Sequence, residues 1–119
     1  MTSMGIKLGL VAIVASLGLG QGAALAASAD KGKKLYVQYG CWGCHGFEGQ
    51  GSVATSGGKV LAPEPMAWET FESFVRTTNR TMPPYRESVL PKADLEDIYA
   101  FLQTIPKPKD YKSIPLLNQ

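Results

Sequence analysis

The chain has 119 residues, which is enough for one small domain. Hydrophobic residues make up 45% of the sequence and charged residues 18%, a balance typical of a globular protein and unlike that of a disordered chain. The formal net charge is only +2 and no basic stripe runs through the sequence, which excludes a nucleic-acid-binding protein.

The first 29 residues differ in composition from the rest. Lys7 is the only charged residue before Asp30, and the apolar run that follows Lys7 ends in small residues, which is the layout of a secretory signal peptide. Two A-x-A patterns, at residues 24–26 and 27–29, are candidate cleavage sites. An uncleaved membrane anchor is the alternative, although glycines weaken the second half of the run as a spanning helix. We expect residues 1–29 to be a cleavable signal peptide and the mature protein to be periplasmic.

Three helices are expected in the remainder of the chain. Apolar residues recur at helical spacing in three segments, residues 30–39, 67–77 and 92–104. Asp30 is suited to cap the first of these helices, and Pro106 stops the last one.

Long connections separate the expected helices, and no strand pattern appears in them. Residues 46–58 hold five glycines, and residues 79–91 contain two adjacent prolines. Loops of this length are unusual in a compact domain unless something other than secondary structure pins them, and a large buried cofactor would do so. The sequence therefore predicts an all-α domain over residues 30–106, followed by an extended tail over residues 107–119.

One short motif carries the chemistry, the run Cys41-Trp42-Gly43-Cys44-His45. The pattern C-x-x-C-H is typical of c-type haem attachment. Two residues between the cysteines let both sulfurs reach one edge of the porphyrin, and the adjacent histidine is placed to ligate the iron from the same side. We expect one covalently bound haem c, with iron.

Other interpretations of the two cysteines fit the sequence less well than haem attachment. A thioredoxin-like dithiol needs a βαβ context, which the sequence lacks. A tetrahedral zinc site needs four ligands, whereas the chain has two cysteines and one histidine in total. A disulfide between Cys41 and Cys44 would close a very small loop and contribute little, and a chance occurrence is the last alternative.

The mature chain resembles the class I cytochromes c, the small periplasmic electron carriers with one haem. The resemblance covers residues 30–105 and rests on five motifs in order: Gly32-x-x-x-Tyr36, the haem motif, Gly46-x-x-Gly49-x-Gly51, Met82-Pro83-Pro84 and Leu95-x-x-Ile98-Tyr99-Ala100-Phe101-Leu102. It implies a cytochrome c fold in which the first and last helices cross and pack around the haem. Two departures are an extra residue between Tyr36 and Cys41, where the helix end is expected to bulge, and Pro91-Lys92 in place of a Ser or Thr cap.

The second iron ligand is expected to be a methionine, because His45 is the only histidine. Met82 is favoured, since it lies in a loop stiffened by prolines and stands where the family places its axial methionine. Met66 lies at the start of a helix, where a gap-filling core role is the default. An open or weakly ligated iron remains the alternative. The expected cofactor-binding residues are thus Cys41, Cys44, His45 and Met82, of which His45 and Met82 bind the metal, and no catalytic residue is expected.

Other residues are expected to orient His45, bind the haem propionates or lie near the haem edge. The ring N–H of His45 is expected to donate to the carbonyl of Pro63 or of a residue beside it, as in the family. Candidates to bind the haem propionates are Trp68, Arg76, Arg80 and Lys59. Trp42 is expected near the exposed haem edge, either in a docking patch or as packing.

The expected function is one-electron transfer between periplasmic redox enzymes by a protein that is not itself an enzyme. A dehydrogenase or quinol-oxidising complex would be the donor, and an oxidase or reductase the acceptor. One alternative is a dedicated cytochrome subunit of a periplasmic dehydrogenase, with the apolar tail in a partner groove. Another is a gas sensor or peroxidase with an open iron. We expect a monomer or an enzyme subunit, bound to the membrane only if the N-terminal segment is uncleaved.

Overall fold

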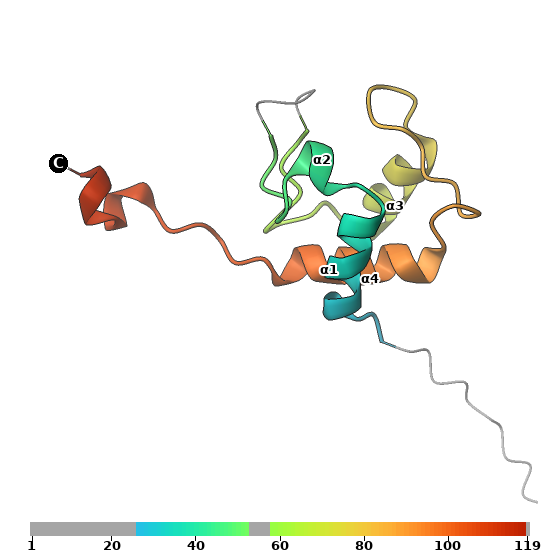
Figure 1. The fold of residues 1–119 in the computed structure, drawn as a ribbon, viewed down its shortest axis with the longest axis horizontal. Helices are drawn as coiled ribbons and strands as arrows, with labels where there is room; N and C mark the ends of the chain where they lie inside the picture. The colour runs from blue at the N-terminus through green and yellow to red at the C-terminus, as the bar shows by residue number, and fades with distance from the viewer. Residues whose placement is uncertain (1–25, 53–57, 119) are drawn as a thin grey trace, which may run out of the picture.

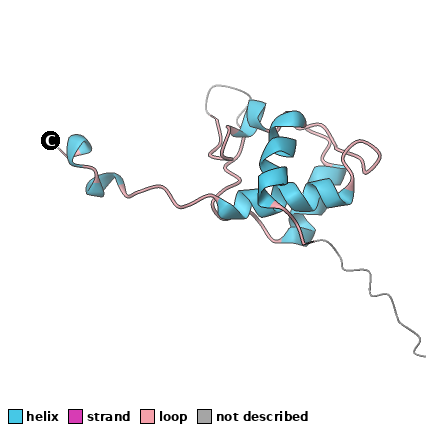
Figure 2. Ribbon diagram, turned by 60° about the horizontal axis from the view of Figure 1, so that its bottom comes forward, coloured by secondary structure: helices cyan, strands magenta, loops and turns pink. Residues whose placement is uncertain are grey.

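The computed structural model describes residues 26–52 and 58–118, and within them every regular element is helical (Figure 2). The elements are listed here in chain order: α1 (Ala29–Gln38), α2 (Trp42–His45), α3 (Trp68–Thr77), α4 (Lys92–Thr104) and two 3-10 turns, η1 (Tyr111–Ser113) and η2 (Pro115–Leu117). The predicted all-α class is confirmed. Most of the expected signal peptide, residues 1–25, lies outside the described residues.

The long helices follow the prediction closely, and one cap differs. The last helix has the predicted limits, and the middle helix begins one residue later than expected. The prediction that Asp30 caps the first helix is wrong. Ser28 is the N-cap, with an extended backbone and a side-chain oxygen that accepts the Lys31 N–H at 3.3 Å. Asp30 instead lies in the first turn, where its negative charge is favoured by the helix dipole.

Helix α1 ends in a tight turn directly before the haem motif. Gly40 has a φ of 77°, a conformation that glycine adopts without strain. Its N–H donates to the carbonyl of Val37, and the N–H of Cys41 donates to the carbonyl of Tyr36, both at 3.1 Å. This pair of bonds is a Schellman motif, which ends α1. Helix α2 begins only a few residues later.

The first and last helices cross, as the resemblance implies (Figure 1). Gly32 allows the crossing, because a Cβ at this position would overlap the backbone of Asp97 and Ile98. On the same side of α1, the ring of Tyr36 lies 5.5 Å from that of Phe101 and is fully buried. The small residue brings the two backbones together and the two rings fill the space beside them.

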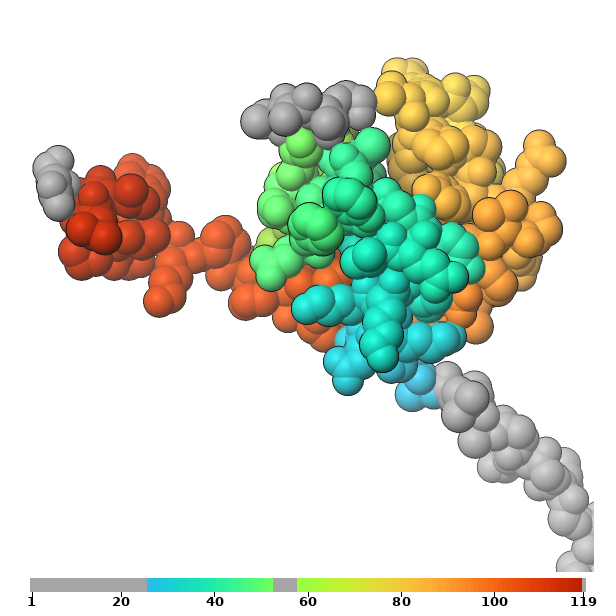
Figure 3. Space-filling model, viewed as in Figure 1, coloured from blue at the N-terminus to red at the C-terminus, as the bar shows by residue number. Residues whose placement is uncertain are grey.

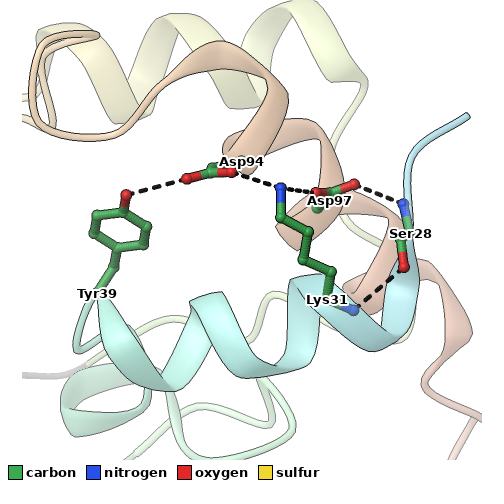
Figure 4. A network of polar contacts seen from close by, with 5 residues as sticks. All are labelled: Ser28, Lys31, Tyr39, Asp94 and Asp97. Carbon is green, nitrogen blue, oxygen red and sulfur yellow. Dashed lines mark hydrogen bonds and ion pairs between the residues drawn. The ribbon is translucent and has the colours of Figure 1, made fainter. Parts of the chain in front are cut away.

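A polar network joins the start of α1 to the first half of α4 (Figure 4). Lys31 lies 2.8 Å from a carboxylate oxygen of Asp94 and of Asp97, and Asp97 also accepts the Ser28 N–H at 2.6 Å. Asp97 is only 7% exposed, so its charge needs these partners. Burial opposes ionisation, but Lys31 and the Ser28 N–H outweigh it, and the pKa of Asp97 is lowered.

Helix α3 packs on α4 through aromatic side chains. The ring of Tyr99 lies 5.3 Å from Trp68 and 5.2 Å from Phe71, and its hydroxyl donates to the carbonyl of Met66 at 2.9 Å. Tyr36, Tyr99 and Phe101 therefore all form contacts between helices. The three long helices thus form the frame on which the long loops rest.

The C-terminal tail leaves α4 and stands away from the helical body (Figure 3). The sequence predicts an extended tail, but only its first residues are extended, because the last ones form η1 and η2. Asp110 caps η1, and the side chain of Asn118 donates to the carbonyls of Tyr111, Lys112 and Ile114. Within the part of the chain that the structure describes, no helix combines the length and hydropathy that a membrane span requires.

Candidate functional site

A largely apolar cavity of about 480 Å³ opens inside the helical frame. Its walls come from the haem motif, the segment 58–61, the inner face of α3, the loop before α4 and α4 itself. Its volume lies within the range of cofactor and ligand pockets. Phe74 of α3 is half exposed because it faces this cavity.

One helical turn carries the three residues of the attachment motif. Cys41 has helical backbone angles, and its carbonyl accepts the N–H groups of Cys44 at 3.3 Å and His45 at 3.0 Å. Positions i, i+3 and i+4 share one face of a helix, so all three side chains line the cavity. No disulfide joins Cys41 and Cys44, unlike the disulfide alternative, and burial raises the pKa of the Cys41 thiol to about 11.

His45 is oriented by a backbone carbonyl that the sequence did not single out. Its Nδ1 lies 2.7 Å from the carbonyl oxygen of Lys59, so the prediction that Pro63 or a neighbour supplies this acceptor is wrong. Because a carbonyl oxygen only accepts, this bond requires the proton on Nδ1 and leaves the lone pair of Nε2 for a metal. The bond explains how the ring is held in the orientation that ligation needs.

The segment that supplies this carbonyl is clipped to α2 by backbone contacts. The N–H of Gly51 donates to the carbonyl of His45 at 2.8 Å, and that of Ser52 to the carbonyl of Gly58 at 3.1 Å. Gly58 lies so close to Cys44 that a Cβ would overlap the Cys44 carbonyl. The glycine-rich loop therefore brings its own backbone against the attachment motif.

Both candidate methionines line the cavity, but their surroundings differ. Met82 is half-buried and packs against the hydrophobic core. Met66 is 45% exposed, so its expected role as a core gap-filler is wrong. Its place just before α3 puts it at the open edge of the cavity wall instead.

Two of the four propionate candidates line the cavity, and two do not. Arg80 and Lys59 are part of the cavity wall. Trp68 packs with Phe71 on the α4 side and lies outside that wall. Nη1 of Arg76 donates to the carbonyls of Tyr85 and Leu90, whereas its buried Nη2 has no hydrogen-bond partner among the described residues, and Arg76 lies outside the cavity wall.

Trp42 lies outside the cavity wall and is partly exposed. Its ring stacks on that of Phe47 with centroids 4.8 Å apart and planes 8° apart. Trp42 is 41% exposed and Phe47 is 59% exposed, so the pair forms a flat aromatic surface beside the attachment motif. Phe47, like Tyr85 in the cavity wall, was not among the site residues expected from the sequence, because neither belongs to a motif or to a helical stripe.

An all-α fold with a C-x-x-C-H turn in the wall of an apolar cavity defines a c-type cytochrome. The chain belongs to the family described as cytochrome c oxidase, cbb3-type, subunit III, whose profile matches residues 27–102. No curated protein and no solved structure matches the chain significantly.

The cofactor of this family is covalently bound haem c, and the residues present fit it. Two cysteines that form no disulfide, a histidine with Nε2 available and an apolar cavity are the features that such a haem requires. When bound, the haem iron supplies a one-electron redox couple. The chain is therefore a haem-based electron-transfer protein rather than an enzyme.

Proposed function

We propose that this cytochrome is a periplasmic one-electron carrier, with Cys41 and Cys44 bonded to the haem and His45 and Met82 as its axial ligands. The observation that carries the proposal is that His45 and Met82 reach one cavity from two different elements. His45 comes from α2, and Met82 comes from the loop between α3 and α4.

Two axial ligands make a carrier rather than a catalyst. When both positions are filled by the protein, no position is left for a substrate, oxygen or peroxide. A thioether ligand also favours the ferrous iron and raises the reduction potential. The chain's task is then to hold both ligands still, so that reorganisation on electron transfer is small.

Met82 is preferred to Met66 because it is better held. Met82 packs on the core, and Pro83 and Pro84 restrict the backbone that follows it. Met66 is 45% exposed, and the structure gives it no such packing. A fixed sulfur loses less conformational entropy on ligation than a mobile one.

The two methionines provide a matched experiment on the exported haem-containing protein. Met82→Ala should abolish the weak long-wavelength band of methionine-ligated ferric haem, lower the reduction potential and allow the ferrous protein to bind CO. Met66→Ala should leave all three properties close to those of the wild type. Reduction potentials by redox titration, and optical spectra with and without CO, measure these effects.

The reverse pattern would assign the ligand to Met66. Prompt CO binding by the wild-type protein at neutral pH would instead support the open-site alternative, a gas sensor or peroxidase. Either result would overturn the proposed ligand set without affecting the attachment site. Replacing Cys41 or Cys44 by Ala tests the attachment site separately. Each variant should hold the haem by a single thioether bond or fail to attach it stably.

The proposed location and partners follow from the class of protein and from its charge. Cytochrome c domains are typically exported, and residues 1–29 have the composition of a signal peptide. Without Lys7 the formal net charge falls from +2 to +1, so strong electrostatic steering to a partner is not expected. Docking to a donor and an acceptor would then depend on apolar surface near the site, such as the stacked Trp42 and Phe47.

A second candidate is a cytochrome subunit of a larger redox enzyme. The family is described as a subunit of an oxidase. The tail of this chain also exposes large apolar and aromatic side chains, since Tyr111, Leu116 and Leu117 are each more than 60% exposed. Deleting residues 107–119 should then release the cytochrome from its enzyme while leaving its spectrum unchanged. Co-purification with an oxidase or a dehydrogenase at high salt would favour this candidate, and a freely monomeric wild-type protein would contradict it.

A further inference from the structure

The loop that carries Met82 is held by hydrogen bonds only at its ends. Residues 79–84 make no hydrogen bond with the rest of the described chain. Before them, the N–H of Thr78 still donates to the carbonyl of Phe74 at the end of α3, and after them comes Tyr85. The position of Met82 therefore depends on what fixes Tyr85.

Tyr85 is fixed by three hydrogen bonds to two different elements. Its backbone N–H donates to the carbonyl of Val75 at 2.9 Å, and its hydroxyl donates to the carbonyl of Tyr39 at 2.9 Å. Its own carbonyl accepts Nη1 of Arg76 at 2.9 Å. Tyr85 thus ties the return of the loop to both α3 and the end of α1.

Arg76 extends this attachment to the far end of the loop. The same Nη1 donates to the carbonyl of Leu90 at 2.6 Å, just before α4 begins. Leu90 is 1% exposed, so its carbonyl lies in the interior, where an unpaired polar group is costly. Arg76 on α3 therefore holds the carbonyls of Tyr85 and Leu90 close together, and these two residues mark the start and the end of the second half of the loop.

We propose that Arg76 is a positioning residue for the axial methionine, because its guanidinium closes the Met82 loop at Tyr85 and Leu90. The inference rests on the proposed His45 and Met82 ligation. It assigns to Arg76 a task that differs from propionate binding, for which the sequence made it only one of four candidates. Arg76 keeps the methionine sulfur at the iron by preventing the loop from opening.

Arginine is suited to this task and lysine is not. Both bonds come from one nitrogen, Nη1, whose N–H groups lie in the rigid plane of the guanidinium, whereas an ammonium on a flexible stem has no such fixed donor directions. Arg76→Lys therefore keeps the charge and loses the fixed geometry. Arg76→Met removes both while keeping an unbranched apolar stem.

The experiment measures how fast imidazole replaces the methionine in the exported ferric holoprotein. If the clamp is lost, the loop opens more often and imidazole should bind about ten times faster or more in Arg76→Met, since bonds from a charged donor contribute about that much. Arg76→Lys should fall between this variant and the wild type. The long-wavelength methionine band should weaken in the same order.

Arg86 provides the matched control. It belongs to the same loop, has the same charge and is exposed, and no hydrogen bond of its side chain is present among the described residues. Arg86→Met should leave the imidazole rate and the methionine band unchanged. An equal acceleration in Arg86→Met would show a charge effect and overturn the inference.

Other outcomes separate positioning from a structural or a propionate role. A lower unfolding midpoint in both Arg76 variants with an unchanged imidazole rate would leave Arg76 a stabilising residue only. A lower reduction potential with an unchanged imidazole rate would indicate propionate contact. Either result would overturn the inference. If Arg76→Met does not fold, the decision rests on Arg76→Lys.

The Met82→Ala background separates failure of this inference from failure of the proposed function. Where no methionine is present, adding Arg76→Met should not accelerate imidazole binding further. An equal acceleration in both backgrounds would mean that Arg76 controls access to the cavity instead. If wild-type protein and Met82→Ala bind imidazole at the same rate, the ligand assignment fails and the inference fails with it.

Discussion

Gly32 in α1 lies directly against the carbonyl of Asp97 in α4, with no room for a Cβ between the two backbones. This contact sets the distance between the two crossing helices. It also places Tyr36 beside Phe101, so that the interior next to the cavity is filled. The shape of the haem cavity thus depends on a glycine that does not itself line it.

Replacing Gly32 by Ala should be strongly destabilising. The added methyl group would overlap the backbone of Asp97, which cannot rotate away as a side chain would, so we expect a loss of about 3 kcal/mol or more in the free energy of unfolding. Denaturant unfolding of the holoprotein measures the loss. Lys33→Ala, an exposed change in the same helix, is the control and should have little effect. Equal midpoints for the two variants would contradict the close contact.

Asp97 should make the stability of the protein depend on pH in the acid range. Its pKa is lowered in the folded state, so its stabilising effect is present above its ordinary pKa of 3.8 and is lost as pH falls through the folded pKa. At neutral pH we expect Asp97→Asn to cost about 1–3 kcal/mol. The difference between wild type and variant should shrink below about pH 4. A difference that stays constant from neutral to acid pH would refute this role for the Asp97 charge.

The N-terminal residue of the mature chain should affect stability through Ser28. Its side chain caps α1, and its N–H donates to Asp97. A protein that begins at Ala27 keeps both bonds, whereas one that begins at Asp30 loses both. We expect the shorter protein to be less stable by about 1–2 kcal/mol. Ser28→Ala in the longer protein isolates the cap and should account for about half of the loss.

Thermal unfolding of the two purified forms measures this difference. The intact mass of the exported protein shows which of the two A-x-A patterns is used. If both forms unfold at the same temperature, Ser28 does not contribute as a cap.

Gly58→Ala should disturb the attachment motif itself. A methyl group at this position would overlap the carbonyl of Cys44, so either the loop or the turn must move. We expect less holoprotein and an unfolding midpoint lower by several degrees. Gly43→Ala is the matched control, because a Cβ at Gly43 meets nothing within 4 Å. Absorbance of the covalent haem per protein measures the yield, and equal yields for the two variants would contradict the expected collision.

Local patterns in the sequence were sufficient for the helices and for the attachment motif. Residues 92–104 form the helix that their apolar spacing predicts, since its stripe of buried residues faces one side and Pro106 follows it. The motif of Cys41, Cys44 and His45 is equally local, because one helical turn is enough to bring the three side chains together. The resemblance to class I cytochromes c supplied the crossing of the first and last helices.

The partners of these residues were decided by the tertiary structure. The backbone N–H of Ser28 donates to a carboxylate 69 residues later, and Nδ1 of His45 lies against the carbonyl of Lys59. Arg76, a candidate for propionate binding, instead donates to the carbonyl of Leu90. Such bonds join groups that carry no periodic signal, since any carbonyl can accept and only the folded path of the loop determines which one is near. The sequence by itself therefore determined the helices and the haem motif, and the long loops decided what holds His45 and the Met82 loop in place.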